Sequence, residues 1–190
     1  MSVFVTSDIH FSHRKILEYC PDSRPFSSVE DMNEAIVDNW NKKITNKDEI
    51  FILGDVSFGK PIETCEFLER LNGKSFKLVL GNHDSSKYLK EDRFRYKFEW
   101  IKDYNKVKLF GKDIIMFHYP IEQWDKKHYG SYHFHGHLHS KNPEKLTQRR
   151  VDVGLDGSPN FAPYNLEELL IDIENRLIEE ETVCHHGRNL

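Results

Sequence analysis

The chain has 190 residues, 38% of them hydrophobic, and a formal net charge of −4 from 27 basic and 31 acidic residues. This length predicts one domain with a core of its own, and the charge excludes a broad basic surface for duplex nucleic acid. No apolar run is long enough to cross a membrane, and the N-terminal residues do not resemble a signal peptide. Because its three scattered cysteines are typical of reduced thiols, we expect a cytoplasmic protein.

The first half of the chain predicts alternating strands and helices. Apolar, β-branched runs at residues 2–7, 49–53 and 74–80 predict three buried strands. Between the first two, Ser28 and Asp31 resemble a capping box before a helical pattern. A second helix is predicted over 61–73, which carries Pro near its start and Gly beyond its end. This alternation favours an α/β sheet with parallel strands.

The second half predicts shorter elements. Residues 106–117 have the pattern of a β-hairpin, and residues 131–137 and 149–155 predict further strands. Residues 165–177 mix two apolar periods, so a helix followed by a strand is one interpretation, with Asn165 as a helix cap. The polar end predicts a flexible tail over 181–190, which leaves a single domain over 1–180.

Side chains that can bind metal follow the predicted strands repeatedly. In chain order they are Asp8, His10, Asp55, Asn82, His83, Asp84, His118, His137 and His139. Because loops beyond the carboxyl ends of strands converge on one crevice, we expect these residues to form one site. Carboxylate, imidazole and amide groups together suit borderline divalent ions. Two ions about 3.5–4 Å apart would use such a set to stabilise the oxygens of a phosphoryl displacement.

The segment HFHGHLH at residues 133–139 holds four of the eleven histidines. If it were one continuous strand, all four imidazoles would share a face, so the alternation does not select the ligands among them. His128 and His133 are interpreted as ordinary histidines, and His135 stays open. His185 and His186 in the predicted tail are expected to be solvated.

Five motifs in order carry a family resemblance. They are Asp8-Ile9-His10, Gly54-Asp55, Gly81-Asn82-His83-Asp84, His118 and Gly136-His137-Leu138-His139. This order resembles the D-x-H, G-D, G-N-H-[DE], H and G-H-x-H pattern of the calcineurin-like metallophosphoesterase superfamily. The surrounding sequence is similar to its small stand-alone bacterial and phage members. The resemblance implies an αββα sandwich, with two mixed β-sheets flanked by helices and the metals at the loop edge.

The same resemblance implies a role for each motif residue. One ion would be held by Asp8, His10 and His139, the other by Asn82, His118 and His137, and Asp55 would bridge them. His83 would donate to a phosphate or leaving-group oxygen as the catalytic histidine, oriented by Asp84. The expected cofactors are two Mn²⁺ ions, with Fe²⁺, Zn²⁺, Co²⁺ or Ni²⁺ as alternatives.

One departure from the family pattern bears on the substrate. Many relatives extend the second motif to G-D-x-x-D-R-G, whereas residues 54–59 read GDVSFG and lack the second Asp and the Arg. This disfavours a protein phosphatase and favours a metal-dependent hydrolase of a small phosphodiester or phosphomonoester, of nucleotide size. The alternatives are a single-strand nuclease and a non-catalytic metal-dependent binding module.

Substrate contacts are predicted from residues near the first motif. His13, Arg14 and Arg24 lie in loops close to Asp8 in sequence, and arginine suits bidentate contacts with phosphate oxygens. Solvated surface charge is the alternative for these residues. Tyr119 and Trp124 could stack on a base, although core packing is the more ordinary role of such aromatic residues.

Overall fold

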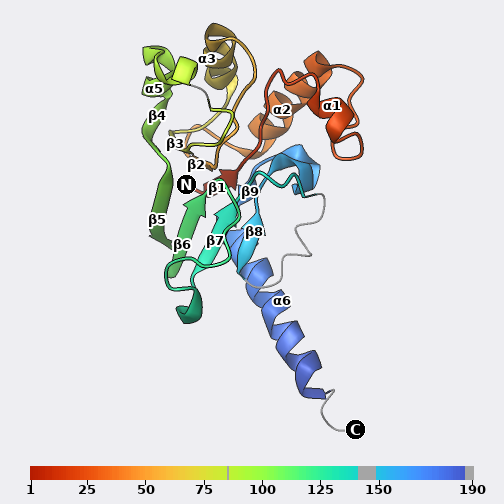
Figure 1. The fold of residues 1–190 in the computed structure, drawn as a ribbon, viewed down its shortest axis with the longest axis vertical. Coiled ribbons are helices and arrows are strands. Elements are labelled where there is room, and N and C mark those ends of the chain that lie inside the picture. Colours follow the sequence, from red (N-terminus) through yellow and green to blue (C-terminus); the bar gives the residue numbers. More distant parts are fainter. Residues whose placement is uncertain (85, 141–148, 187–190) are drawn as a thin grey trace.

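The computed structural model describes residues 1–84, 86–140 and 149–186, and side chains of the last helix up to residue 177. Its strands form two mixed sheets, with the orders β4-β3-β2-β1-β9 and β5-β6-β7-β8 (Figure 1). Helices flank these sheets, so the predicted architecture is confirmed.

The first sheet is built from the predicted βαβ alternation. Its parallel strands are β1 (Val3–Thr6), β2 (Glu49–Ile52), β3 (Ser75–Val79) and β4 (Phe98–Lys102), and β9 (Tyr164–Asn165) pairs antiparallel with β1. The three strands predicted in this half of the chain are all present. β4 was not predicted, nor were the short helices α4 (Ser86–Leu89) and α5 (Asp92–Lys97) before it.

The second sheet begins with the predicted hairpin. Strands β5 (Tyr104–Leu109) and β6 (Lys112–Phe117) pair antiparallel, which confirms that prediction. Two parallel strands follow, β7 (Tyr132–His135) and β8 (Arg150–Asp152). A 3₁₀ turn, η1 (Lys127–Tyr129), lies in the long connection between β6 and β7. Two more, η3 (Leu155–Gly157) and η4 (Pro159–Phe161), follow β8.

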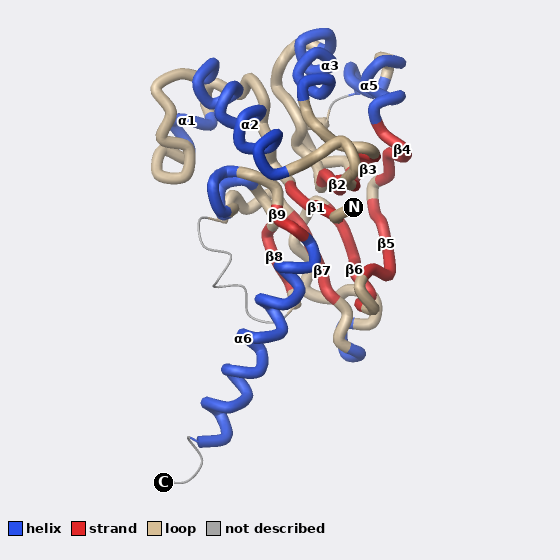
Figure 2. The backbone as a smooth tube through the Cα atoms, turned by 180° about the vertical axis from the view of Figure 1, so that it is seen from behind, coloured by secondary structure: helices blue, strands red, loops and turns tan. Residues whose placement is uncertain are grey.

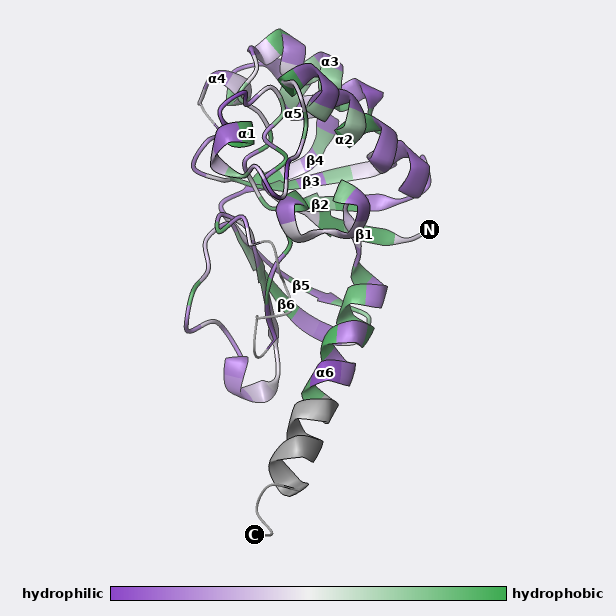
Figure 3. Ribbon diagram, turned by 90° about the vertical axis from the view of Figure 1, so that its right-hand side faces the viewer, coloured by the Kyte–Doolittle hydropathy of each residue, from purple (hydrophilic) through white to green (hydrophobic). Residues whose placement is uncertain are grey.

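Helices cover the first sheet on one side. They are α1 (Ile16–Tyr19), α2 (Val29–Lys43), α3 (Pro61–Arg70) and α5, and Figure 3 shows α2 and α3 across the first sheet from β5 and β6. α2 begins where the capping pattern predicts, because the Ser28 hydroxyl accepts the Asp31 N–H at 3.0 Å. Its apolar face buries Met32 and Trp40 completely against the sheet.

The opposite face of the first sheet packs on the second sheet. Val5 and Phe51 from one sheet and Ile114 and Phe134 from the other belong to the same buried cluster. Side chains of β7 therefore alternate between this core and the outer face, as a strand requires. The two sheets also meet at one edge, where Ser7 donates its N–H to the carbonyl of Val153 at 3.1 Å.

The last helix, α6 (Leu166–His186), runs away from the two sheets toward the C-terminus (Figures 1 and 2). Asn165 accepts the N–H groups of Glu167 and Glu168, so the predicted cap is confirmed. The predicted order of helix then strand is wrong, because β9 precedes the helix. The helix also continues to His186 within the predicted tail, and residues 187–190 lie outside the described residues. In the described chain, no helix has the length and apolarity that a bilayer crossing requires.

Candidate metal centre

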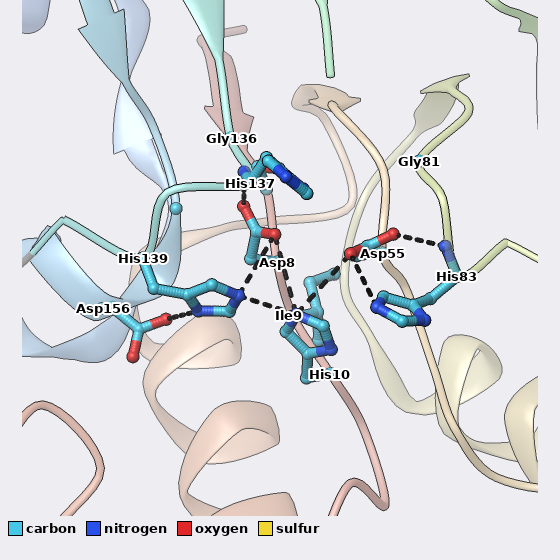
Figure 4. Close-up of polar contacts among 12 residues, drawn as sticks. Asp8, Ile9, His10, Asp55, Gly81, His83, Gly136, His137, His139 and Asp156 are labelled. Atoms are coloured by element: carbon cyan, nitrogen blue, oxygen red, sulfur yellow. Dashed lines mark hydrogen bonds and ion pairs between the residues drawn. The ribbon is translucent and has the colours of Figure 1, made fainter. Parts of the chain in front are cut away.

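The predicted ligands follow the carboxyl ends of β1, β2, β3, β6 and β7, where the two sheets meet. The loops after β1 and β2 run together, because Asp8 and His10 donate their N–H groups to the carbonyls of Gly54 and Asp55, each at 3.0 Å. Figure 4 shows Asp8, His10, Asp55 and His139 turned toward one another. The structure thus gathers residues that are more than 100 positions apart in the chain.

The backbone at these loops is strained. Ten described non-glycine residues have positive φ, and five of them are predicted ligands: Asp8, His10, Asp55, His137 and His139. A residue with a Cβ in this region costs about 1–2 kcal/mol, and such strain clusters at functional sites. The concentration of strain at this edge is therefore independent support for a functional site there.

The first group of donors consists of Asp8, His10 and His139. The Asp8 Oδ1 atom lies 3.6 Å from His10 Nε2 and 3.7 Å from His139 Nε2, and the two Nε2 atoms are 3.2 Å apart. Asp8 Oδ1 is buried without a hydrogen-bond partner. Because facing imidazole nitrogens need a proton or a cation between them, this group fits a metal ion.

The second group of donors consists of Asp55, Asn82, His118 and His137. The Asn82 Oδ1 atom lies 2.9 Å from His118 Nε2 and 3.0 Å from His137 Nδ1. Asp55 Oδ2 lies 3.6 Å from His118 Nε2 and 3.7 Å from His10 Nε2, so this carboxylate stands between the two groups. The structure therefore brings all seven predicted ligands together in the arrangement expected of a bridged pair of ions. Their assignment as ligands stays a prediction.

Each carboxylate of the centre has one oxygen held by the backbone. Asp8 Oδ2 accepts the His137 N–H at 2.9 Å, and Asp55 Oδ1 accepts the His83 N–H at 2.8 Å (Figure 4). These approaches require glycine. A Cβ added to Gly136 would lie 2.2 Å from Asp8 Oδ2, and one on Gly81 would lie 2.3 Å from Asp55 Oδ1. The other oxygen of each carboxylate is left to face the imidazoles.

The carboxylate of Asp8 is ionised at neutral pH. Burial by itself would raise its pKa, but the neighbouring His10 and His139 imidazoles outweigh burial and lower the pKa to about 2. A permanently charged and buried carboxylate needs a positive partner, which is consistent with a cation at this position.

A buried ion pair supports His139 from behind. The His139 Nδ1 atom donates to Asp156 Oδ2 at 2.8 Å, which leaves Nε2 toward Asp8. Arg24 donates to both oxygens of Asp156, at 2.9 and 2.8 Å. Burial would raise the pKa of Asp156, but the hydrogen bonds from His139 and Arg24 hold it well below its usual range. The tautomer of His139 is therefore set by a permanently charged partner.

Arg24 does not face the place expected for a substrate. Its side chain is fully buried, and its remaining donors reach the carbonyls of Asp8 at 2.6 Å and Ile9 at 3.1 Å. This placement contradicts the predicted phosphate contact, because every guanidinium nitrogen already has a partner within the protein. Arg24 instead fixes the loop that carries the first motif.

His83 and Asp84 point in different directions. The His83 side chain is 44% exposed, and its Nε2 atom lies 4.0 Å from Asp55 Oδ2. The Asp84 carboxylate is buried and accepts the N–H groups of Asp55, Val56 and Gly81 at 2.8–2.9 Å. The predicted pairing of Asp84 with the His83 imidazole is therefore not found. Asp84 instead ties the loop after β2 to the loop after β3, and burial raises its pKa to about 6.

The four histidines of residues 133–139 separate into two pairs. β7 ends at His135, and the chain then bends at His137 and Leu138, with positive φ at His137 and His139. His133 is buried and contacts the Ile115 carbonyl and the Ile121 N–H, which confirms its ordinary structural role. His135 is also buried, with its Nδ1 atom 2.9 Å from the Gly136 carbonyl. This bend, and not strand alternation, selects which pair reaches the donor groups.

Residues 1–150 match the family described as calcineurin-like phosphoesterase. The chain belongs to this family. The match includes every motif that carried the resemblance and ends before Asp156. Family membership shows the fold and the metal-binding motif of the chain, and it leaves the substrate to be determined.

Two curated relatives and one solved structure are similar to this chain. An uncharacterized protein of Methanocaldococcus jannaschii is 31% identical over 178 residues, which cover 90% of this chain and 91% of the relative. The Gene 66 protein of a Mycobacterium phage is 27% identical over 93% of this chain and 99% of its own length. A crystal structure of a protein of unknown function from Aquifex aeolicus has a TM-score of 0.69 at 24% identity, over 88% of this chain and 97% of that one. The last likeness shows the fold alone.

Two other predicted substrate residues of this phosphoesterase-family chain lie outside the donor groups. His13 is half-buried beside His10, with 5.2 Å between the ring centroids, and burial together with the neighbouring His10 lowers its pKa to about 4. The imidazole is thus neutral at neutral pH. Arg14 is exposed and pairs with Glu30 at 3.4 Å, which matches the alternative of solvated surface charge. Of these two residues, only His13 contacts a predicted ligand.

Two residues at the centre were missed by the sequence analysis. Asp156 lies in a GLDG segment that looks like an ordinary turn, and no local pattern connects it to His139. Phe58, in the second motif, is 39% exposed although it packs on histidines of the centre. A large apolar residue three positions after Asp55 was the available signal for Phe58. Trp124, by contrast, is half-buried, packs on His133 and donates to Ser131, which fits a structural role.

Proposed function

We propose that this protein is a dinuclear-metal-dependent phosphoesterase that hydrolyses a small phosphodiester or phosphomonoester of nucleotide size. One observation carries the proposal: Asp55 Oδ2 stands within 3.7 Å of imidazole nitrogens from both donor groups. A carboxylate shared in this way is what two adjacent ions require. Family membership supports the same chemistry. The proposal includes a cytoplasmic location and the absence of binding to duplex nucleic acid or to membranes.

The ligands would be divided as the family resemblance implies. Asp8, His10 and His139 would hold one ion, Asn82, His118 and His137 the other, and Asp55 both. We expect two Mn²⁺ ions, because the donor set mixes oxygen and imidazole nitrogen. When bound, the ions supply positive charge to the phosphoryl oxygens and acidify a water nucleophile.

The remaining groups position and stabilise the substrate. The exposed imidazole of His83 lies beside Asp55 and can donate a hydrogen bond to a phosphate or leaving-group oxygen. Asp84 acts only through the backbone, by holding the loops that carry Asp55 and His83. We therefore keep His83 as the proposed catalytic residue and treat Asp84 as a positioning residue.

The test is hydrolysis of a phosphoester panel by protein stripped with a chelator and reloaded with Mn²⁺. The panel contains bis-p-nitrophenyl phosphate, p-nitrophenyl phosphate, cyclic nucleotides and dinucleotides. We expect Mn²⁺-dependent turnover, and Asp55→Ala should lower kcat by at least about 10³-fold because the shared carboxylate is lost. Asp113→Ala is the matched control, since this carboxylate pairs with Lys126 at the surface.

The outcomes separate the proposal from its alternatives. Faster cleavage of single-stranded oligonucleotides than of every small ester would favour the nuclease. Two bound ions per chain without turnover of any ester would favour the binding module. Equal activity of wild type and Asp55→Ala would contradict the proposed centre.

A further inference from the structure

Two aromatic side chains remain exposed beside the donor groups. Phe58 is 39% exposed and Tyr119 is 37% exposed, and both contact imidazoles of the donor groups. Phe58 lies three residues after Asp55, and Tyr119 directly follows His118. Their position suggests a role in substrate binding that the metal motifs do not include.

Phe58 lies at the end of the centre that carries His10 and His83. Its ring stacks on the His13 imidazole, with 3.7 Å between centroids and 6° between planes. It also contacts His83 at 4.6 Å and His10 at 5.4 Å. The Phe58–His13 stack presents a flat surface next to the proposed catalytic histidine.

Tyr119 lies at the end that carries His118 and His137. Its ring meets the His137 imidazole edge to face at 4.8 Å and the His118 imidazole at 5.0 Å. Phe117 supports it from β6, with 5.5 Å between ring centroids. Asp55 Oδ2 lies between the His10 and His118 nitrogens, so the two exposed rings stand at the two ends of the centre.

The charges that surround the centre favour a substrate with one negative charge. Of the two arginines expected at the phosphate, Arg24 is buried against Asp156 and Arg14 pairs with Glu30. A monoester dianion gains most from an additional guanidinium, whereas a diester carries a single charge. A diester also has two organic arms, and each arm could lie against one ring.

We propose that Phe58 and Tyr119 are specificity-determining residues for a phosphodiester whose two ester arms both carry flat aromatic groups, such as nucleobases. The leaving arm lies against Phe58, because His83 beside it can donate to the departing oxygen. The retained arm lies against Tyr119. This inference rests on the proposed phosphodiesterase activity and adds its substrate class.

The experiment compares two diesters that share charge and leaving group. Bis-p-nitrophenyl phosphate and methyl p-nitrophenyl phosphate differ only in the retained arm, which is aryl in one and methyl in the other. For Tyr119→Leu at saturating Mn²⁺, we expect the ratio of their kcat/KM values to fall by roughly five- to tenfold, the usual size of one aromatic contact. For Phe58→Leu, kcat/KM should fall by a similar factor for both esters, and Phe58→Tyr should restore it.

Binding supplies a readout that does not depend on turnover. By calorimetry on Mn²⁺-loaded protein, adenosine monophosphate should bind roughly tenfold more tightly than inorganic phosphate, because its base can stack. Tyr119→Leu should remove this preference. Manganese stoichiometry, measured on every variant, separates a lost stacking surface from a damaged centre. Tyr129→Leu is the control, since Tyr129 is 90% exposed on η1 and should leave all ratios unchanged.

Two results would overturn the inference. One is a Tyr119→Leu variant that keeps both the wild-type ratio of kcat/KM for the two esters and the wild-type preference for adenosine monophosphate over phosphate. The other is a Phe58→Tyr variant as impaired as Phe58→Leu. Failure of the proposed function looks different: the wild type with two bound Mn²⁺ ions hydrolyses no ester, while the calorimetric comparison still decides whether Tyr119 binds a base.

Discussion

Each functional residue of the centre depends on a neighbour that presents it. Asp8 and Asp55 each give one oxygen to a backbone N–H and turn the other toward imidazole nitrogens. His118 donates its Nδ1 proton to the Leu53 carbonyl at 2.7 Å, which leaves Nε2 toward Asp55. Fixing a tautomer in this way is how proteins aim imidazole at metal. At the scale of residues, each donor atom is therefore oriented by a second group that binds the other end of the same side chain.

The Asp156 carboxylate gives the most direct test of such a pair. Asp156→Asn should weaken Mn²⁺ binding by about 10- to 100-fold, because His139 loses the charged group that fixes its tautomer. It should also lower the free energy of unfolding by roughly 3 kcal/mol, since buried Arg24 loses its partner. Calorimetric Mn²⁺ titration and urea unfolding measure the two effects. Unchanged Mn²⁺ affinity in a folded variant would show that Asp156 serves stability alone.

The sequence predicted which residues gather at the centre better than it predicted what the neighbouring side chains contact. All seven predicted ligands lie together, because their chemical type and their place after strands are both visible in the sequence. Arg24 and Asp84 were predicted to act on substrate and on His83, yet both turn into the protein. The direction of a loop side chain depends on partners elsewhere in the fold, such as Asp156 for Arg24. Local sequence carries no record of those partners.

At the scale of elements, the ends of strands explain the site. Strands β1, β2 and β3 are parallel, so their following loops emerge at one edge, as their apolar runs predict. The end of β7 was less predictable, because HFHGHLH alternates as a continuous strand would. The pairing of β7 with β8 ends at His135 and Asp152. The next residue, Gly136, packs against Asp8 instead. Strand β4 was missed because no strong apolar run marks it.

His133 lies on the face of β7 opposite the core between the sheets, and its burial predicts how the stability of the fold changes in acid. Burial lowers the pKa of His133 to about 4, below the value near 6.5 of an unfolded chain. The unfolded state therefore binds the proton more strongly. The stability that neutral His133 provides is fully present above pH 6.5 and is lost as the pH falls toward 4. The loss approaches roughly 1.4 kcal/mol per pH unit.

Replacing His133 tests this linkage. The free energy of unfolding of His133→Gln, measured with urea on chelator-treated protein, should fall less steeply between pH 6.5 and 4.5 than that of the wild type. The difference between the two proteins isolates His133 from the other histidines. Parallel pH profiles would mean that His133 keeps an ordinary pKa in the fold.

At the scale of the whole molecule, the centre joins the two sheets. Its donors come from loops after three strands of the first sheet and two of the second. Ions bound there would connect both sheets and stabilise the folded state only. Mn²⁺ at about 100 times its dissociation constant should therefore add about 2.7 kcal/mol to the free energy of unfolding.

Thermal unfolding of stripped and reloaded protein measures this effect. We expect Mn²⁺ to raise the Tm of the wild type, and to raise that of Asp55→Ala much less. A wild-type Tm that does not respond to Mn²⁺, Zn²⁺ or Co²⁺ would contradict a centre that spans the two sheets.

The sequence by itself determined the family, the α/β class and the set of candidate ligands. This was possible because strand patterns, turn glycines and ligand chemistry are local properties, repeated here in a specific order. Only the tertiary structure decided that Arg24 and Asp156 form a buried pair behind His139, that Asp84 binds backbone, and that Phe58 and Tyr119 stand at the two ends of the centre. These arrangements depend on which side chains meet across the fold, and the packing of two sheets brings together residues whose local sequences are independent.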